Sequence, residues 1–72
     1  MRTKPFTKSI YPNLVKELIE RNETQKDLGD AIGLSKTSVN YKFTGKVEWS
    51  ISEIEKVCEY FGKDYYELFK RD

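Results

Sequence analysis

The sequence predicts an all-α fold made of five short helices. Apolar residues recur at three- and four-residue intervals along most of the 72 residues, and polar caps and glycines separate these stripes. No segment alternates apolar and polar residues for long enough to predict a strand. A chain of this length has room for one domain with a modest core, so its free energy of unfolding should be small.

The chain divides into an arm and a helical domain. Residues 1–12 contain both prolines and three basic residues and show no helical period, so we expect a flexible N-terminal arm unless an apolar residue docks on the body. Residues 13–72 form the predicted domain. Its first helix begins near Pro12, a residue suited to a first helical turn. The residues predicted to face inward on this helix are Leu14, Val15, Leu18 and Ile19.

The second and third helices are marked by their caps. Thr24 and Ser35 are good N-caps, and Asp27 places a carboxylate near the positive end of the second helix. Gly33 suits the left-handed conformation that closes a helix. The residues predicted to face inward are Leu28, Ala31 and Ile32 on the second helix, and Val39 and Phe43 on the third.

The fourth helix has the clearest start signal. Ser50 and Glu53 have the spacing of a capping box, and Gly62 marks the end of the helix. Asp64 then caps a short fifth helix. The residues predicted to face inward are Ile51, Ile54, Val57, Cys58 and Phe61 on the fourth helix, and Tyr65, Leu68 and Phe69 on the fifth.

The composition excludes several classes of site. The chain has no histidine and one cysteine, so a Ser-His or Cys-His couple, an intrachain disulfide and a thiolate metal cage are all excluded. We therefore predict no enzyme activity, no metal site and no cofactor. No apolar run is long enough to span a membrane and no signal-peptide core follows Met1, so we expect a soluble, cytoplasmic protein.

Charge is unevenly distributed although its sum is only +1. Residues 1–46 hold nine basic and five acidic residues, a balance of +4, whereas residues 47–72 hold four and seven, a balance of −3. The segment Gly33–Lys46 contains three lysines and no acid. Such a surface does not repel phosphates, although the net charge is too low for coating nucleic acid by charge alone.

The link between the second and third helices is too short for an antiparallel pair. Little more than Gly33 and Leu34 separates them, which forces a steep crossing of the helix-turn-helix type. With Gln25 as the first position of this motif, Gly29 is the fifth, Gly33 the ninth and Val39 the fifteenth. These positions require a small residue at the helix contact, a glycine in the turn and a buried aliphatic residue, respectively.

With these features the sequence resembles the Cro/lambda-repressor-like (XRE-type) helix-turn-helix family, and within it the small phage regulators of Gram-positive hosts. The resemblance covers roughly residues 13–69 and implies a five-helix bundle that binds operator DNA, usually as a dimer. One departure is Lys42, because the family often has an aliphatic residue there, whereas Phe43 is the inward residue in this chain. The segments that carry the resemblance are Thr24–Leu28, Gly33–Ser35, Thr44–Lys46 and Trp49–Val57.

The third helix is predicted to expose polar side chains suited to base edges in a major groove. With Val39 and Phe43 inward, helical geometry places Thr37, Ser38 and Tyr41 outward and Lys36, Asn40 and Lys42 toward the edges. The resemblance implies that Gln25 contacts a backbone phosphate, beside the free N–H groups of its helix. Lys36, Lys42 and Lys46 are predicted to contact phosphates or bases, with Lys26 as a further candidate. Basic residues of the arm would follow the backbone or enter a minor groove. The predicted DNA-binding residues are Gln25, Lys26, Lys36, Thr37, Ser38, Asn40, Tyr41, Lys42 and Lys46.

Two functions remain open at this stage. The first is a phage- or prophage-type transcriptional regulator in a bacterial host, which binds double-stranded operator DNA through the helix at 35–44. The second is an antirepressor, a protein-binding helix-turn-helix domain that pairs with a phage repressor and blocks its DNA binding. The low net charge and the aromatic content favour this second function. A homodimer is possible in either case, with the aromatic segment 60–69 as the expected face.

Overall fold

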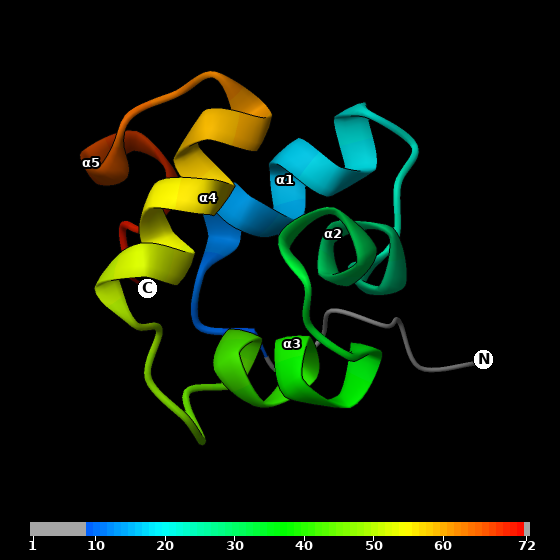
Figure 1. Ribbon diagram of the computed structural model, residues 1–72. Helices are drawn as coiled ribbons and strands as arrows, with labels where there is room; N and C mark the ends of the chain where they lie inside the picture. Colours follow the sequence, from blue (N-terminus) through cyan, green and yellow to red (C-terminus); the bar gives the residue numbers. More distant parts are fainter. Residues whose placement is uncertain (1–8, 72) are drawn as a thin grey trace, which may run out of the picture.

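The protein is described here from a computed structural model, which covers residues 9–71. Residues 1–8, most of the predicted arm, and Asp72 lie outside the described residues. The described part of the chain contains five helices and no strand, which confirms the predicted all-α class. None of these helices has the length and apolar character needed to cross a membrane. The helices are α1 (Pro12–Glu20), α2 (Gln25–Ile32), α3 (Lys36–Phe43), α4 (Ile51–Phe61) and α5 (Tyr65–Leu68) (Figure 1).

The helix ends have the capping chemistry that the sequence predicted. Thr24 and Ser50 each form a complete capping box, with Asp27 and Glu53 as the respective partners. Ser35 accepts a hydrogen bond from the backbone N–H of residue 38, so α3 starts immediately after the turn. Because each cap supplies partners for the unpaired N–H groups of a first helical turn, these short helices have defined starting points.

Glycine closes two of the helices in the left-handed conformation. Gly33 ends α2 with φ of 83° and Gly62 ends α4 with φ of 69°. A left-handed residue reverses the direction of the chain at once. Only Leu34 and Ser35 therefore lie between Gly33 and α3.

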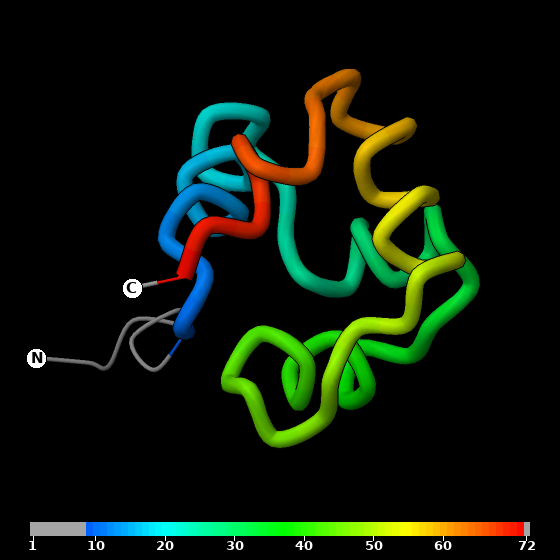
Figure 2. The backbone as a smooth tube through the Cα atoms, turned by 90° about the vertical axis from the view of Figure 1, so that its left-hand side faces the viewer, coloured from blue at the N-terminus to red at the C-terminus, as the bar shows by residue number. Residues whose placement is uncertain are grey.

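The core joins all five helices around aromatic rings. Leu14, Leu28 and Val57 are fully buried and come from α1, α2 and α4. Trp49, in the loop before α4, lies with its ring centroid 6.1 Å from that of Phe43 and 5.5 Å from that of Phe69. This aromatic row ties α3 to the C-terminal segment, although α3 lies at one end of the molecule and α5 near the other (Figures 1 and 2).

The first described residues of the chain pack on the body. The backbone N–H of Ile10 donates to the carbonyl oxygen of Phe43 at 2.9 Å, and Tyr11 is buried with its ring edge against Phe69. Both residues belong to the segment predicted as a flexible arm. At these two positions an apolar residue docks on the body, so this end of the arm is not flexible. The end of α3 is therefore fixed to the N-terminal segment as well as to α2.

Some residues predicted to face inward are exposed. Ile51 is 77 % exposed, because at roughly 100° per residue it points about 100° away from the direction shared by Val57 and Phe61. Tyr65 is 48 % exposed, although its ring stacks on Phe69. Ile19 and Ala31 are also exposed. The buried stripes are narrower than the sequence predicted.

Candidate nucleic-acid interface

The turn between α2 and α3 produces a close contact between the two helices. The backbone N–H groups of Gly33 and Leu34 both donate to the carbonyl oxygen of Gly29. A Cβ atom added to Gly29 would lie 2.5 Å from the carbonyl oxygen of Leu34 and 3.2 Å from a methyl group of Val39. Residue 29 must therefore be glycine for the helices to cross at this distance.

Helix α3 presents one face to the core and the other to solvent. Val39 and Phe43 are fully buried, as predicted. Lys36, Thr37 and Tyr41 are exposed on the other side of the helix. The predicted outward placement of Thr37 and Tyr41 is therefore confirmed. These two residues lie four positions, or about one helical turn, apart on α3. These hydroxyl groups are available to donate and accept hydrogen bonds at base edges.

Two of the predicted DNA-binding residues use their polar groups in hydrogen bonds within the protein. The side chain of Ser38 is half-buried, and its hydroxyl lies 3.1 Å from that of Ser35. Asn40 is also half-buried and donates from Nδ2 to Oε1 of Gln25 at 3.3 Å. This bond connects α3 to the first residue of α2 and was not predicted.

Gln25 is buried, with 7 % of its surface exposed. Its side chain lies against α3 rather than in solvent, and its backbone N–H belongs to the first turn of α2. The first four N–H groups of a helix have no partner within the helix. The capping box occupies the N–H of Asp27 through the Thr24 hydroxyl, so a phosphate would be bound by the N–H groups of Gln25 and Lys26. The Gln25 side chain itself packs against α3.

The predicted position of Lys42 at the edge of this surface is wrong. Only 8 % of the residue is exposed, and its Nζ lies 3.0 Å from Oε1 of Glu53. The same ammonium group donates to the carbonyl oxygen of Glu48 at 3.1 Å. Lys42 is buried because it follows Val39 by three residues, which places both on the inner face of α3. This three-residue spacing to Val39 was the only feature of the sequence that indicated a buried Lys42.

The remaining predicted lysines lie at the surface. Lys26 pairs with Asp30 one turn along α2 at 3.1 Å, and both side chains are about two-thirds exposed. Lys46 places its ammonium group 4.9 Å from the centroid of the Tyr41 ring. Exposed pairs of this kind are weak, so both ammonium groups are available to phosphates. Lys36 and Lys46 extend the polar face of α3 at its two ends.

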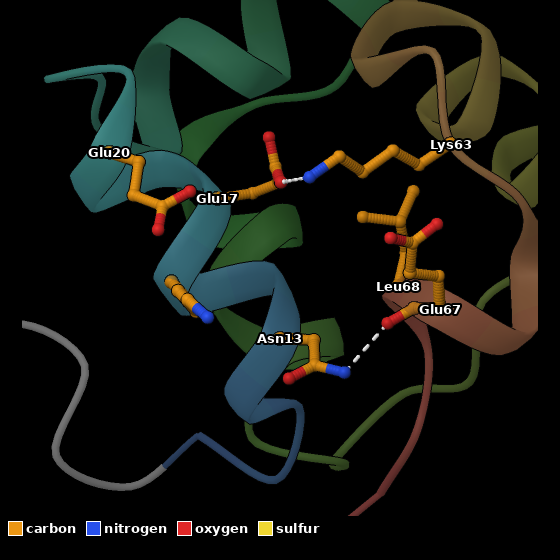
Figure 3. A pocket seen from close by; sticks show the side chains of 7 residues that line it. Asn13, Glu17, Glu20, Lys63, Glu67 and Leu68 are labelled. Atoms are coloured by element: carbon orange, nitrogen blue, oxygen red, sulfur yellow. Dashed lines mark hydrogen bonds and ion pairs between the residues drawn. The ribbon is translucent and has the colours of Figure 1, made fainter.

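A second polar region lies between α1 and α5, as a hollow of about 140 Å³. Glu17 is ion-paired there with Lys63 and also with Arg21, and Asn13 donates to the carbonyl oxygen of Glu67 at 2.7 Å (Figure 3). The hydrogen bond from Lys63, opposed by burial and assisted by Arg21, lowers the pKa of the Glu17 carboxyl group. These groups satisfy one another, so the hollow is part of the framework that joins α1 to the C-terminal segment.

Acidification should weaken the fold through Glu17. Because its pKa is lowered by folding, its stabilising contribution is complete above the unfolded value of roughly 4.3 and is lost as the pH falls through the folded value. Glu17→Gln should lower the melting temperature at pH 7 by roughly 5 °C, with a much smaller difference at pH 3. Thermal unfolding followed by circular dichroism at both pH values measures this. An equal difference at pH 3 and pH 7 contradicts it.

Comparison with known proteins agrees with this geometry. The family model described as Cro/C1-type HTH DNA-binding domain matches residues 13–72. The matched region includes all of α2, α3 and the turn between them. No curated protein and no solved structure gave a match.

Proposed function

Because the chain belongs to the Cro/C1-type helix-turn-helix DNA-binding family, we propose that it is a transcriptional regulator of phage or prophage type that reads operator DNA through the helix at 35–44. The proposal includes a cytoplasmic site of action in a bacterial host and no catalytic role. The single observation that carries it is the outward face of α3. That face carries hydroxyl and amide side chains and no acidic residue, and lysines flank it.

The proposed contacts differ in kind along this surface. Thr37, Tyr41 and Asn40 are proposed to meet base edges, and Ser38 lies beside them at the start of α3. Lys26, Lys36 and Lys46 are proposed to meet phosphates as point charges. Gln25 takes part through the N–H groups of the first turn of α2. Lys42 is left out of this set because its ammonium group is buried against Glu53.

A binding titration at several salt concentrations tests this proposal. The purified protein is titrated, with fluorescence anisotropy as the signal, against duplexes tiled across its own promoter region and against a scrambled duplex. We expect selective binding, with the logarithm of affinity falling against the logarithm of salt concentration by about 0.9 per neutralised phosphate. Three exposed lysines predict a slope of roughly −3 for each monomer. Absence of selective binding to any duplex contradicts the proposal.

The antirepressor alternative is favoured by one specific observation. Tyr41 is 40 % exposed and Val47, in the following loop, is 44 % exposed, so the polar face of α3 has an apolar edge. Exposed tyrosines are frequent anchors of protein interfaces. In this case the purified protein does not retard its promoter DNA alone, but it relieves the retardation caused by a repressor from the same locus. A gel shift with and without that repressor separates the two functions.

A homodimer is part of the leading proposal, since operators of this family are usually bound by two subunits. Phe61, Leu68 and Phe69 of the predicted face are buried in the core. Tyr65 and Tyr66 therefore supply the apolar surface, with exposed fractions of 48 % and 84 %. We expect sedimentation velocity to detect dimers at high micromolar concentration, and Tyr66→Ala to shift them to monomers. A wild-type protein that stays monomeric at that concentration would contradict the proposed homodimer.

A further inference from the structure

The buried ion pair at the end of α3 points to a residue that positions the DNA-reading surface. We propose that Lys42 is a positioning residue, which locks the loop 44–50 against α4 and thereby sets the place of Lys46 at the DNA backbone. Lys42 itself does not touch DNA. This inference rests on the proposed function, and it departs from the aliphatic residue that the resemblance implies at this position.

The ammonium group of Lys42 has three partners, all beyond its own helix. It lies 3.0 Å from Glu53 Oε1 at the start of α4 and donates to the carbonyl oxygen of Glu48 at 3.1 Å. It also lies 5.9 Å from the centroid of the Trp49 ring. These contacts reach the loop and the helix that follows it, so a single side chain spans the whole connection from α3 to α4.

Glu53 links this ion pair to the cap of α4. Its Oε1 atom accepts from the backbone N–H of Ser50 at 2.9 Å, while the hydroxyl of Ser50 accepts from the N–H of Glu53 at 3.2 Å. Burial opposes ionisation of Glu53, but the hydrogen bonds from Ser50 and Lys42 together lower its pKa. The carboxylate is therefore charged at neutral pH and holds the cap and the lysine at the same oxygen.

The other end of the loop is fixed to the last turn of α3. The backbone N–H groups of Lys46 and Val47 donate to the carbonyl oxygen of Tyr41 at 2.9 and 3.2 Å, and the Thr44 hydroxyl donates to the same oxygen at 3.1 Å. The loop is thus anchored at Tyr41 on one side and through Lys42 on the other. Without the second anchor, the segment that carries Lys46 is held at Tyr41 but no longer at Glu48.

The direction in which DNA affinity changes when an acidic side chain is neutralised tests the proposal. Glu53→Gln keeps a residue compatible with a capping box but leaves the buried Lys42 without its counter-charge. If only charge mattered, loss of an acid would strengthen DNA binding. We expect instead that Glu53→Gln and Lys42→Met each weaken binding to a mixed-sequence duplex of about 20 base pairs, by about tenfold. The matched control is Glu55→Gln, an exposed acid on the same helix, which should keep or slightly raise the affinity.

Amide hydrogen exchange of the protein without DNA gives an independent readout. We expect faster exchange at Lys46 and Val47 in Glu53→Gln and Lys42→Met, and exchange as in the wild type in Glu55→Gln. Equal affinities for Glu53→Gln and Glu55→Gln, or loop exchange unchanged in both test variants, overturns the proposal. If the wild-type protein binds no duplex at all, the proposed function fails while the exchange experiment still decides whether Lys42 holds the loop.

Discussion

Gly29→Val should lower the melting temperature of this protein by roughly 10–20 °C. The Cβ atom of any other residue at position 29 meets the carbonyl oxygen of Leu34 at 2.5 Å, a distance that requires the backbone to move. Valine adds two more methyl groups to a Cβ atom that would already lie 3.2 Å from a methyl group of Val39. Overpacking costs about 1–3 kcal/mol or more, which is a large fraction of the total stability, roughly 4–10 kcal/mol for a domain of this size. Thermal unfolding monitored by circular dichroism measures the effect.

Gly33 provides the matched control for this substitution. It has φ of 83°, and a Cβ atom added there meets nothing within 4 Å. Asparagine tolerates the left-handed conformation better than other residues with a side chain, so Gly33→Asn should unfold cooperatively with a loss of about 1 kcal/mol or less. A Gly29→Val protein that melts like Gly33→Asn contradicts the close helix crossing.

The sequence was sufficient to predict the crossing because its determinants are local. Thr24, Gly33 and Ser35 define where α2 ends and α3 begins, and each acts on atoms only a few residues away. Gly29 was predicted as a small residue at a helix contact because it is the fifth position of the motif counted from Gln25. What spacing alone did not provide was the identity of the contacting atom, which is a backbone oxygen of the turn itself.

The burial of Lys42 could not be predicted from the sequence, because it depends on contacts with residues distant in the chain. Its inward direction followed from the spacing to Val39, but its partner Glu53 lies beyond a loop whose path the sequence does not define. Helical geometry separates Lys42 from Val39 by about 60°, which was interpreted as an edge position. Lysine is rarely buried without a paired charge, and the sequence did not show that Glu53 would supply one. The bond between Asn40 and Gln25 was missed for the same reason. Residues on α3 that make no such contacts, such as Thr37, were placed correctly.

Replacing Thr37 and Tyr41 together with alanine should remove sequence-selective DNA binding while the fold is retained. Both side chains are exposed on α3, so the free energy of unfolding should change by only about 0.5 kcal/mol. Two lost base contacts predict a weakening of roughly 3 kcal/mol, or about 100-fold, on the selected duplex. Binding to the scrambled duplex should change little, and the salt dependence should stay the same, because neither residue carries a charge. Anisotropy titrations on both duplexes measure this.

Two further variants separate recognition from general surface effects. Thr37→Ala with Tyr41→Phe keeps the ring that Lys46 covers and removes only the hydroxyl groups, so it should lose most of the selectivity and keep the phosphate contacts. Ile51→Ala with Ser52→Ala removes an exposed apolar side chain and a hydroxyl from α4, outside the proposed dimer face, and should bind both duplexes like the wild type. Equal losses in this pair and in the α3 pair would show that exposed hydroxyl and apolar groups anywhere on the surface support binding, and α3 would then have no special role in reading DNA.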